Sequence, residues 1–472
     1  MENYNSLSQI QKEISSHKTT CKNLVEGYLN NISENKSINA FIETYDAEAL
    51  RLAECVDVKI KNGKAGKLAG LVLGIKDNIC YKGHSSSAAS KILEGFKSTY
   101  SATVVERLIK EDAIIIGRLN CDEFAMGSSS ENTPYGPVRN PLNTKYVAGG
   151  SSGGSAAAVK ANFCQAALGT DTGGSIRQPS AFCGVMGLKP TYGLVSRHGL
   201  IAYASSFDQI GPITKSAEDL AHIMHVISGK DDFDSTCFGE KSIQKIPEIK
   251  KYHKFAVIKQ TIAFKNLNSE IQNNFNAFLK NIQSKGHKVE YIDLPLLDYL
   301  VPTYYILTTA EASSNLSRYD GIKYGHQAKE DQLIKMVNKS RTDGFGDEVK
   351  RRILLGTFVL SSGYYDAYYT KAQKIRQLIK RETEKILKKH HYILSPTTPN
   401  LPFKLGTKRH SPTELYQEDI FTVQANLSGH PAISFPFAKT KDDFYVSAQL
   451  IGRYFSELDM ISISKQILEN YR

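Results

Sequence analysis

The segment LAGLVLGIKDNI (residues 68–79) decides the fold class, together with TVVERLIKED (103–112) and AIIIG (113–117) further along the chain. The first segment is a short apolar run, which predicts a buried strand that ends near Ile75. The second has the periodicity of an amphipathic helix, and the third is another short apolar run. A strand, a helix and a strand in this order predict an α/β core with at least some parallel pairing.

A second unit of the same kind follows in the C-terminal half. KFAVIK (254–259), SEIQNNFNAFLKNIQSKG (269–286) and KVEYID (288–293) again predict a strand, a helix and a strand. A helical region is expected over about 302–390, and its last part, from residue 364 to 389, has the pattern of one long helix. PAISFPF (431–437) and FYVSAQLI (444–451) predict two more strands, and SELDMISISKQILENY (456–471) predicts a closing helix.

The segments on either side of this core predict its boundaries. Residues 1–65 have the pattern of amphipathic helices, and TTCKNLVEGYLNNISE (19–34) offers Thr19 or Thr20 as an N-cap. We expect residues 1–65 to form a helical segment packed on the core, and residues 66–472 to form the main domain. Residues 230–251 are polar and irregular, which predicts an excursion from that domain.

Composition places the chain among ordinary globular proteins. Hydrophobic residues make up 41% and charged residues 23% of its 472 residues, so extensive disorder is not expected. No stretch approaches eighteen consecutive apolar residues, which argues against a membrane span. The start of the chain has neither the apolar core of a secretory signal nor the arginine-rich character of a transit peptide. We therefore expect a soluble protein of the cytoplasm.

Cysteine usage and charge exclude several kinds of site. The seven cysteines are scattered and form no CxxC pair, which is typical of reduced thiols and argues against a disulfide framework or a zinc site. We expect no metal ion in this chain. Cys183 has no motif around it that would activate a thiol. The net charge of +11 is spread along the chain without a basic stripe or an RNA-binding motif, so direct nucleic-acid binding is not favoured.

Two glycine- and serine-rich stretches stand out, AGGSSGGSAAA (148–158) and GTDTGGSIRQPSAFCG (169–184). A flexible linker should lead into a new domain, but the first stretch continues as a helical pattern and then returns to apolar packing. A phosphate cradle would need GxxxxGK[ST], or GxGxxG between a strand and a helix, and neither pattern is present. Ordering a long flexible loop inside a compact core is also entropically costly. An active site is the third interpretation.

The chemistry of the second stretch favours that interpretation. Consecutive glycines lack a Cβ atom, so Thr172, Gly173 and Gly174 can present backbone N–H groups to an oxyanion next to Ser175. A serine nucleophile needs a base, and histidine is the usual one. His84 and His198 lie in loops without a neighbouring acid, and His222 and His225 lie on a predicted helix, which does not favour a Ser-His-Asp triad but leaves it open.

GIKDNI (74–79), GGSSGGSAAAV (149–159) and GTDTGGSIRQPSAFCGVMGLKPTYG (169–193) together resemble the amidase signature family, in the family's order and with similarity over nearly the whole chain. The resemblance implies an α/β fold with a central mixed β-sheet covered by helices on both faces, and makes residues 66–472 the catalytic domain. It implies that Ser175 is the nucleophile and that Lys76 is the base. Ser151, after a cis peptide bond from Gly150, would connect them.

The resemblance also assigns supporting roles around this set. The amides of Thr172, Gly173 and Gly174 would form the oxyanion hole. Ser152 and Ser155 are then supporting residues, for example as caps of the helix that follows. Asp171 and Arg177 flank Ser175, and from this position we interpret them as a structural pair. Lys76 has to be neutral to accept a proton, so its pKa has to fall from about 10.4, and burial at the end of an apolar strand can lower it.

Three further stretches resemble one branch of that family, the glutaminase subunits of tRNA-dependent amidotransferases. They are EASSNLSRYDGIKYG (311–325), EVKRRILLGTFVLSSGYYDAYY (348–369) and DIFTVQANLSGHPAISFPF (419–437). This resemblance implies that Ser175 attacks the side-chain amide of glutamine and that ammonia is released. It assigns Arg352 to the α-carboxylate of glutamine and Asp419 to its α-ammonium group, with Tyr304 as a further binding residue. The sequence alone does not separate Arg352 from its neighbour Arg351.

The same resemblance implies partners. A B subunit would bind ATP and Mg²⁺ and use the ammonia to convert Glu-tRNA(Gln) to Gln-tRNA(Gln), and a small C subunit would complete a heterotrimer. Ser428 and His430 depart from the smaller or apolar residues expected in this branch, which leaves details of the glutamine pocket open. A stand-alone amide hydrolase with the same catalytic residues is the first alternative, and a non-catalytic assembly subunit is the second.

Overall fold

The structure is a computed structural model that describes residues 3–238, 252–407, 414 and 416–471. Within these residues, eleven strands form one sheet, and β4 (Arg139–Asn140) pairs with β5 (Asn143–Val147) beside it. The strands of the sheet, in spatial order, are β1 (Phe41–Thr44), β3 (Ile114–Leu119), β2 (Val72–Lys76), β6 (Ala166–Asp171), β8 (Gln209–Thr214), β7 (Met186–Lys189), β12 (Ala432–Lys439), β13 (Tyr445–Ile451), β11 (Tyr392–Pro396), β9 (Lys254–Ile258) and β10 (Lys288–Ile292).

The sheet is mixed, as the sequence predicts. β3, β2 and β6 run parallel to one another, and so do β11, β9 and β10. The remaining neighbours are antiparallel. Both predicted β–α–β units are therefore confirmed, and each supplies part of a parallel region near one edge of the sheet.

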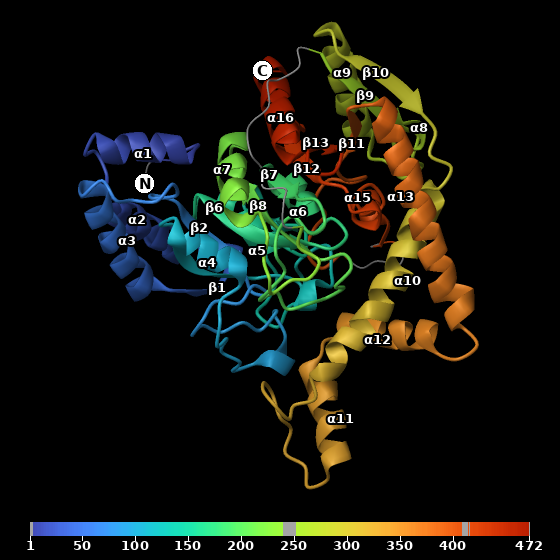
Figure 1. Ribbon diagram of the computed structural model, residues 1–472, viewed down its shortest axis with the longest axis horizontal. Helices are drawn as coiled ribbons and strands as arrows, with labels where there is room; N and C mark the ends of the chain where they lie inside the picture. The colour runs from blue at the N-terminus through green and yellow to red at the C-terminus, as the bar shows by residue number, and fades with distance from the viewer. Residues whose placement is uncertain (1–2, 239–251, 408–413, 415, 472) are drawn as a thin grey trace.

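Helices surround the sheet, with the N-terminal helices at one end and α10 to α13 at the other (Figure 1). The longer helices are α1 (Leu7–Ser15), α2 (Cys21–Glu34), α3 (Asp46–Lys61), α4 (Thr103–Lys110), α5 (Gly153–Lys160), α6 (Arg177–Cys183), α7 (Ala217–Ile227), α9 (Ser269–Ser284), α10 (Leu297–Asn315), α11 (Leu333–Gly344), α12 (Asp347–Leu360), α13 (Lys371–Lys389) and α16 (Glu457–Tyr471). Two short helices are α8 (Lys259–Ile262) and α15 (Val423–Ser428). No helix among the described residues is both long enough and apolar enough to cross a bilayer.

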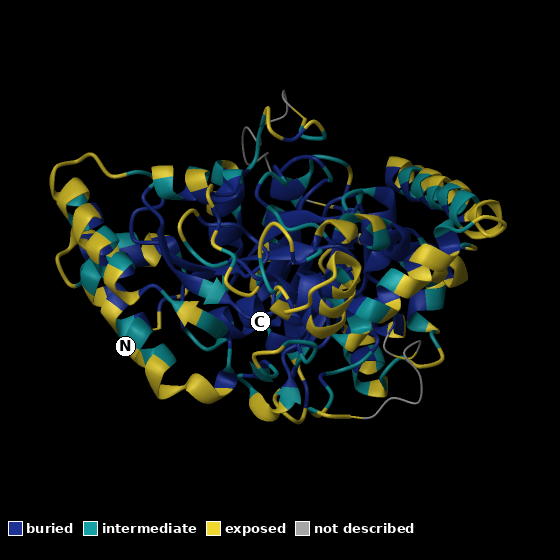
Figure 2. Ribbon diagram, turned by 90° about the horizontal axis from the view of Figure 1, so that it is seen from below, coloured by how far each residue is buried: buried dark blue, intermediate teal, exposed yellow. Residues whose placement is uncertain are grey.

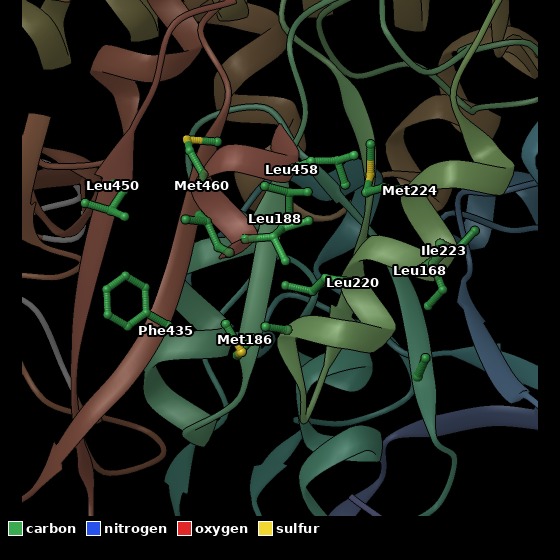
Figure 3. Packing of buried hydrophobic residues seen from close by; sticks show 14 of the residues in the cluster. Leu168, Met186, Leu188, Leu220, Ile223, Met224, Phe435, Leu450, Leu458 and Met460 are labelled. Atoms are coloured by element: carbon green, nitrogen blue, oxygen red, sulfur yellow. The ribbon is translucent and has the colours of Figure 1, made fainter. Parts of the chain in front are cut away.

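The two faces of the sheet bury alternate side chains of each strand. Leu73 and Ile75 of β2 pack on one face with α4 and α7, whereas Val72 packs on the other with α2 and α5. In Figure 3, Leu220 of α7 and Leu458 of α16 lie close to Leu188 of β7 on the first face. Figure 2 shows that buried residues fill the centre of the molecule and that the outer helices expose one side to solvent. The central strands β2 and β6 therefore lie in the interior.

Some boundaries differ from the sequence-based expectation. The first 65 residues are mostly helical, and Thr20 is the N-cap of α2, but residues 41–44 form the edge strand β1. This strand is only four residues long, too short for a clear alternating pattern. Residues 364–389 are not one regular α-helix, because a π-helical turn, Asp366–Thr370, precedes α13. The division at residue 65 stays a prediction, and residues 239–251 of the predicted excursion lie outside the described residues.

Candidate active site

Lys76 is the last residue of β2, and its amine is buried in the interior. Nζ lies 2.7 Å from Ser151 Oγ, 3.0 Å from Ser152 Oγ and 2.8 Å from Thr170 Oγ1. Burial lowers the pKa of Lys76 to about 8, although carboxylates such as Asp122 favour its charged form. A substantial fraction of the amine is therefore neutral near pH 8 and can accept a proton.

The hydroxyls around this amine are not equivalent. Ser152 Oγ donates to the carbonyl of Thr170 at 3.0 Å, so its single hydrogen is already used. Ser151 Oγ lies closest to Lys76 and donates to no other group within the described residues. Ser151 is therefore well placed to pass a proton to the neutral amine. Ser152 does not cap α5 through its side chain, as the sequence suggested, because its hydroxyl contacts Lys76 and Thr170 instead.

The turn that presents Ser151 contains the cis Gly150–Ser151 peptide bond that the resemblance implies. The amide of Gly150 donates to Gln178 Oε1 at 2.9 Å, and the amide of Ser152 donates to the carbonyl of Ser175 at 3.1 Å. These two bonds attach the Ser151 turn to the segment that contains Ser175.

Ser175 lies in the turn between β6 and α6, and its side chain is largely buried. Its hydroxyl makes no hydrogen bond within the described part of the chain, and the hydrogen bond of Ser151 Oγ is to Lys76. The structure therefore brings Lys76, Ser151 and Ser175 together and forms the Lys76–Ser151 half of a relay. It leaves the Ser175 hydroxyl free of a protein partner among these residues.

The backbone amides before Ser175 are used differently from one another. The Gly174 N–H donates to Asp171 Oδ1 at 2.9 Å, so this amide already has an acceptor. The amides of Thr172 and Gly173 have no such side-chain acceptor among the described residues. A Cβ atom on Gly173 would lie 2.5 Å from the ring of Tyr304, so only glycine fits against this tyrosine. Gly174 as an oxyanion donor stays a prediction and would require its N–H to be shared.

Asp171 and Arg177 form the buried pair that the sequence predicts. Arg177 donates to both carboxylate oxygens, from Nε at 3.0 Å and from Nη2 at 2.9 Å, and Asn426 Nδ2 adds a third bond at 2.8 Å. Burial opposes ionisation of Asp171, but the Arg177 guanidinium outweighs it and holds the pKa of this carboxyl at about 2. An ionised Asp171 can therefore hold the amides of the nucleophile turn.

Arg352 lies on α12 with its guanidinium buried among aromatic rings. Nε donates to Glu348 Oε1 at 2.8 Å and Nη1 donates to Tyr203 Oη at 2.8 Å. The guanidinium carbon also lies 5.2 Å from the ring centre of Tyr305 and 5.5 Å from that of Tyr416. Burial opposes the charge, but Tyr203 and Glu348 outweigh it and hold the pKa of Arg352 above its ordinary value.

Asp419 lies at the end of a 3₁₀ turn, Gln417–Asp419, next to the hydroxyl group of Tyr305. Its carboxylate accepts from Tyr305 Oη at 2.8 Å and from Ser128 Oγ at 3.1 Å. Burial raises the pKa of Asp419 to about 7, and no cation within the described residues forms an ion pair with it. A buried cation and a buried carboxylate thus both contact Tyr305. Tyr304, the preceding residue on α10, packs against Gly173 of the nucleophile turn.

A family model described as amidase matches residues 23–460 of this chain. The chain belongs to the amidase signature family. The matched range includes every strand of the central sheet and also Lys76, Ser151 and Ser175.

The relatives of this chain that are described here have names from one branch of the family. The chain is 47% identical to the A subunit of glutamyl-tRNA(Gln) amidotransferase from Legionella pneumophila (strain Paris), over 98% of this chain and 96% of that protein. It is 43% identical to the A subunit of the enzyme with the same name from Salinibacter ruber, over 99% of this chain and all of that protein. The crystal structure of the corresponding Thermotoga maritima protein has a TM-score of 0.77 at 41% identity, covering 93% of this chain and 90% of that one.

Other candidate residues of this amidase lie away from the site. Ser428 donates a hydrogen bond to the carbonyl of Gln424, and the ring of His430 stacks on that of Tyr454 with 4.0 Å between the ring centroids. Among the described residues, neither side chain makes a contact with Arg352 or Asp419. Burial raises the pKa of the Cys183 thiol to about 12, which agrees with an unreactive cysteine.

Several residues that shape the site were not predicted from the sequence. Tyr203, Tyr305 and Tyr416 surround Arg352, and Ser128 holds Asp419. Thr170 is the one with a local signal, because it immediately precedes the Asp171 motif and ends beside Lys76. The others are ordinary tyrosines and serines in the sequence, and only the fold brings them to the site.

Proposed function

We propose that this chain is the glutaminase subunit of a tRNA-dependent amidotransferase. The observation that favours a glutaminase over a general amidase is that Tyr305 contacts both a buried cation, Arg352, and a buried carboxylate, Asp419. The α-carboxylate of a free amino acid needs a cation and its α-ammonium group needs an anion. The names of the similar proteins support the same activity.

The proposed reaction begins at Ser175. Its hydroxyl oxygen attacks the side-chain carbonyl carbon of glutamine, its proton passes to Ser151, and the proton of Ser151 passes to neutral Lys76. The amides of Thr172 and Gly173 stabilise the negative charge on the carbonyl oxygen. When the C–N bond breaks, the proton returns from Lys76 through Ser151 to the leaving nitrogen, which departs as ammonia. A water molecule then cleaves the glutamyl ester along the same proton path and releases glutamate.

The ammonia serves a partner. In this proposal a B subunit, which holds ATP and Mg²⁺, activates the glutamate of Glu-tRNA(Gln) and transfers the ammonia to it, and a C subunit completes a cytoplasmic heterotrimer. Residues of this chain supply no step of the ATP chemistry. This division between the subunits agrees with the site of this chain, whose groups are suited to bind one amino acid and to hydrolyse its side-chain amide.

The decisive test is Ser175→Ala in the assembled complex, with glutamine or ammonium as nitrogen donor. We expect glutamine-dependent formation of Gln-tRNA(Gln) to be lost and ammonium-dependent formation to persist, because only the release of ammonia is removed. Lys76→Ala should behave in the same way, and Ser317→Ala, which alters an exposed serine on a distant turn, serves as the control.

Three other outcomes would contradict the proposal or one part of it. Full glutamine-dependent activity of Ser175→Ala would show a non-catalytic assembly subunit. Broad turnover of simple amides by the isolated chain, without stimulation by partners, would show a stand-alone amide hydrolase. Failure of ammonium to support the Lys76→Ala complex would show that Lys76 is structural.

A further inference from the structure

Thr422 occupies the position before α15, three residues after Asp419. A threonine at a helix N-cap ordinarily accepts a hydrogen bond from an amide of the first turn. Thr422 makes no such side-chain cap, and its hydroxyl instead donates to the carbonyl oxygen of Gly173 at 2.6 Å. The side chain is fully buried, so this bond is shielded from water. Helix capping therefore does not explain this threonine.

The contact holds one peptide unit of the nucleophile turn from both ends. The carbonyl of Gly173 and the N–H of Gly174 belong to the same planar peptide. Thr422 binds the oxygen at 2.6 Å, and Asp171 Oδ1 binds the N–H at 2.9 Å from the other side. With both groups bound, this peptide cannot rotate without breaking a buried hydrogen bond. As a result, the neighbouring N–H group of Gly173 and the backbone that leads into Ser175 are held in one orientation.

The packing around Thr422 leaves this turn little freedom. A Cβ atom on Gly174 would lie 2.3 Å from Thr422 Oγ1, so the threonine fills the space next to the glycine. Arg177, which holds Asp171, also donates from Nη1 to the carbonyl of Thr422 at 2.9 Å. The Thr422 hydroxyl also lies 3.0 Å from the carbonyl of Asp419. The threonine thus connects the turn before Ser175 with the residue proposed to hold the α-ammonium group.

A second buried hydrogen bond, from Thr172 to Asp208, also holds this turn. Thr172 Oγ1 donates to Asp208 Oδ1 at 2.7 Å, and the other oxygen of Asp208 accepts from the amide of Tyr203 at 2.9 Å. Tyr203 in turn binds Arg352. Both residues proposed to hold the α-groups of glutamine are therefore linked to the turn before Ser175.

We propose that Thr422 is a positioning residue whose hydroxyl holds the Gly173–Gly174 peptide so that the amides beside Ser175 face the oxyanion of the transition state. The proposal rests on the glutaminase function proposed above. Thr422 does not touch the substrate in this role. Its effect is on the transition state, because misplacing reacting groups by about 1 Å can cost about 100-fold in rate.

The test compares Thr422→Val with Thr422→Ser in the assembled complex. Valine has the shape of threonine but cannot donate a hydrogen bond, whereas serine keeps the hydroxyl. We expect Thr422→Val to lower kcat for glutamine about 10- to 100-fold, with KM changed much less. This is less than the roughly 100- to 1,000-fold loss that follows removal of an oxyanion donor, because the donors are displaced and not removed. Thr422→Ser should recover most of kcat. Thr261→Val removes another buried hydroxyl bond, to the carbonyl of Ile258, which involves no residue of the proposed site, and should leave kcat unchanged.

A binding measurement separates positioning from general damage. The boronic acid analogue of glutamine, in which B(OH)₂ replaces the side-chain carboxamide, forms a tetrahedral adduct with a serine nucleophile and so resembles the transition state, whereas glutamate resembles the ground state. Thr422→Val should weaken binding of the boronic acid by about the factor lost in kcat/KM and leave glutamate binding nearly unchanged. If the valine variant does not fold, Thr422→Cys, of similar size and with a weak donor, takes its place with the same expectation.

The possible failures are distinguishable. Wild-type kcat in Thr422→Val, or an equal loss of boronic acid and glutamate binding, would overturn the positioning role and leave the proposed function intact. A wild-type complex that neither hydrolyses glutamine nor forms the boronic acid adduct would overturn the proposed function itself.

Discussion

Lys76 shows at the scale of a single residue how burial prepares a base. Burial lowers its pKa to about 8, so the fraction in the neutral form falls as the pH drops below that value. The proposed reaction needs the neutral form. We therefore expect kcat for glutamine to rise about tenfold per pH unit well below pH 8 and to level off above it, as measured in a pH–rate profile of the complex. A profile that is flat from pH 6 to 9 would contradict Lys76 as the base.

Arg352 is the residue on which glutamine binding should depend most. Removing one partner of a buried, hydrogen-bonded charge pair costs about 2 kcal/mol or more, which corresponds to about 30-fold in affinity. We expect Arg352→Ala to raise KM for glutamine by about that factor or more, while amidation with ammonium persists. Arg351→Ala, which alters the neighbouring exposed arginine, is the matched control. An unchanged KM would remove Arg352 from the pocket.

The Asp171–Arg177 pair is a matter of stability as well as geometry. Arg177 is fully buried and donates to two carboxylate oxygens, so its loss would leave an ionised carboxylate without its cation. We expect Arg177→Met to lower the free energy of unfolding by about 3–5 kcal/mol, measured by urea denaturation. Arg381→Met on the exposed side of α13 should change it by less than about 0.5 kcal/mol. Equal effects of the two substitutions would show that the pair contributes little.

At the scale of elements, the contact of α10 with α12 sets the shape of the proposed glutamine pocket. Tyr304 and Tyr305 lie on α10 and Arg352 lies on α12, so the spacing of the two helices fixes these side chains relative to one another. A Cβ atom on Gly356 would lie 1.9 Å from the carbonyl oxygen of Thr309. The close approach of the two helices therefore depends on this glycine.

We expect Gly356→Ala to separate the two helices, because neither backbone can yield without moving its helix. The free energy of unfolding should fall by about 1–3 kcal/mol, the usual cost of overpacking, and KM for glutamine should rise. Thermal unfolding and glutamine kinetics of the complex measure the two effects. Thr357→Ala, at the next and exposed position of α12, is the control; matching behaviour of both variants would refute the close-contact explanation.

The whole molecule raises the question of how hydrolysis is matched to the use of ammonia. The chain is similar to named amidotransferase subunits over nearly its full length, and in the proposed function the acceptor of ammonia belongs to another chain. We expect glutaminase activity to be low in the isolated chain and to rise when the B subunit is added together with Glu-tRNA(Gln), as measured by glutamate release. Activity of the isolated chain that is as high as that of the complex would contradict this coupling.

The sequence predicted those parts of the fold that have strong local patterns. The two β–α–β units and the strands β12 and β13 were predicted from their residues, and so was an N-cap at Thr19 or Thr20, which the structure places at Thr20. Other strands, such as β1 and β11, were not predicted, because a short apolar run alone does not distinguish a strand from a segment of a buried helix. Their conformation depends on the neighbours with which they pair.

The sequence by itself determined the identity of the chemical groups. Lys76, Ser151 and Ser175 stand in short motifs whose order identifies the family, and Asp171 lies six residues before its partner Arg177. Tertiary structure alone decided the environment of these groups. The lowered pKa of Lys76 comes from burial on all sides, and Thr422 reaches Gly173 across 249 residues of sequence. Local sequence patterns extend over a few turns of a helix or a few residues of a strand. Neither burial on all sides nor a contact between residues so far apart in the sequence can therefore be predicted from such patterns.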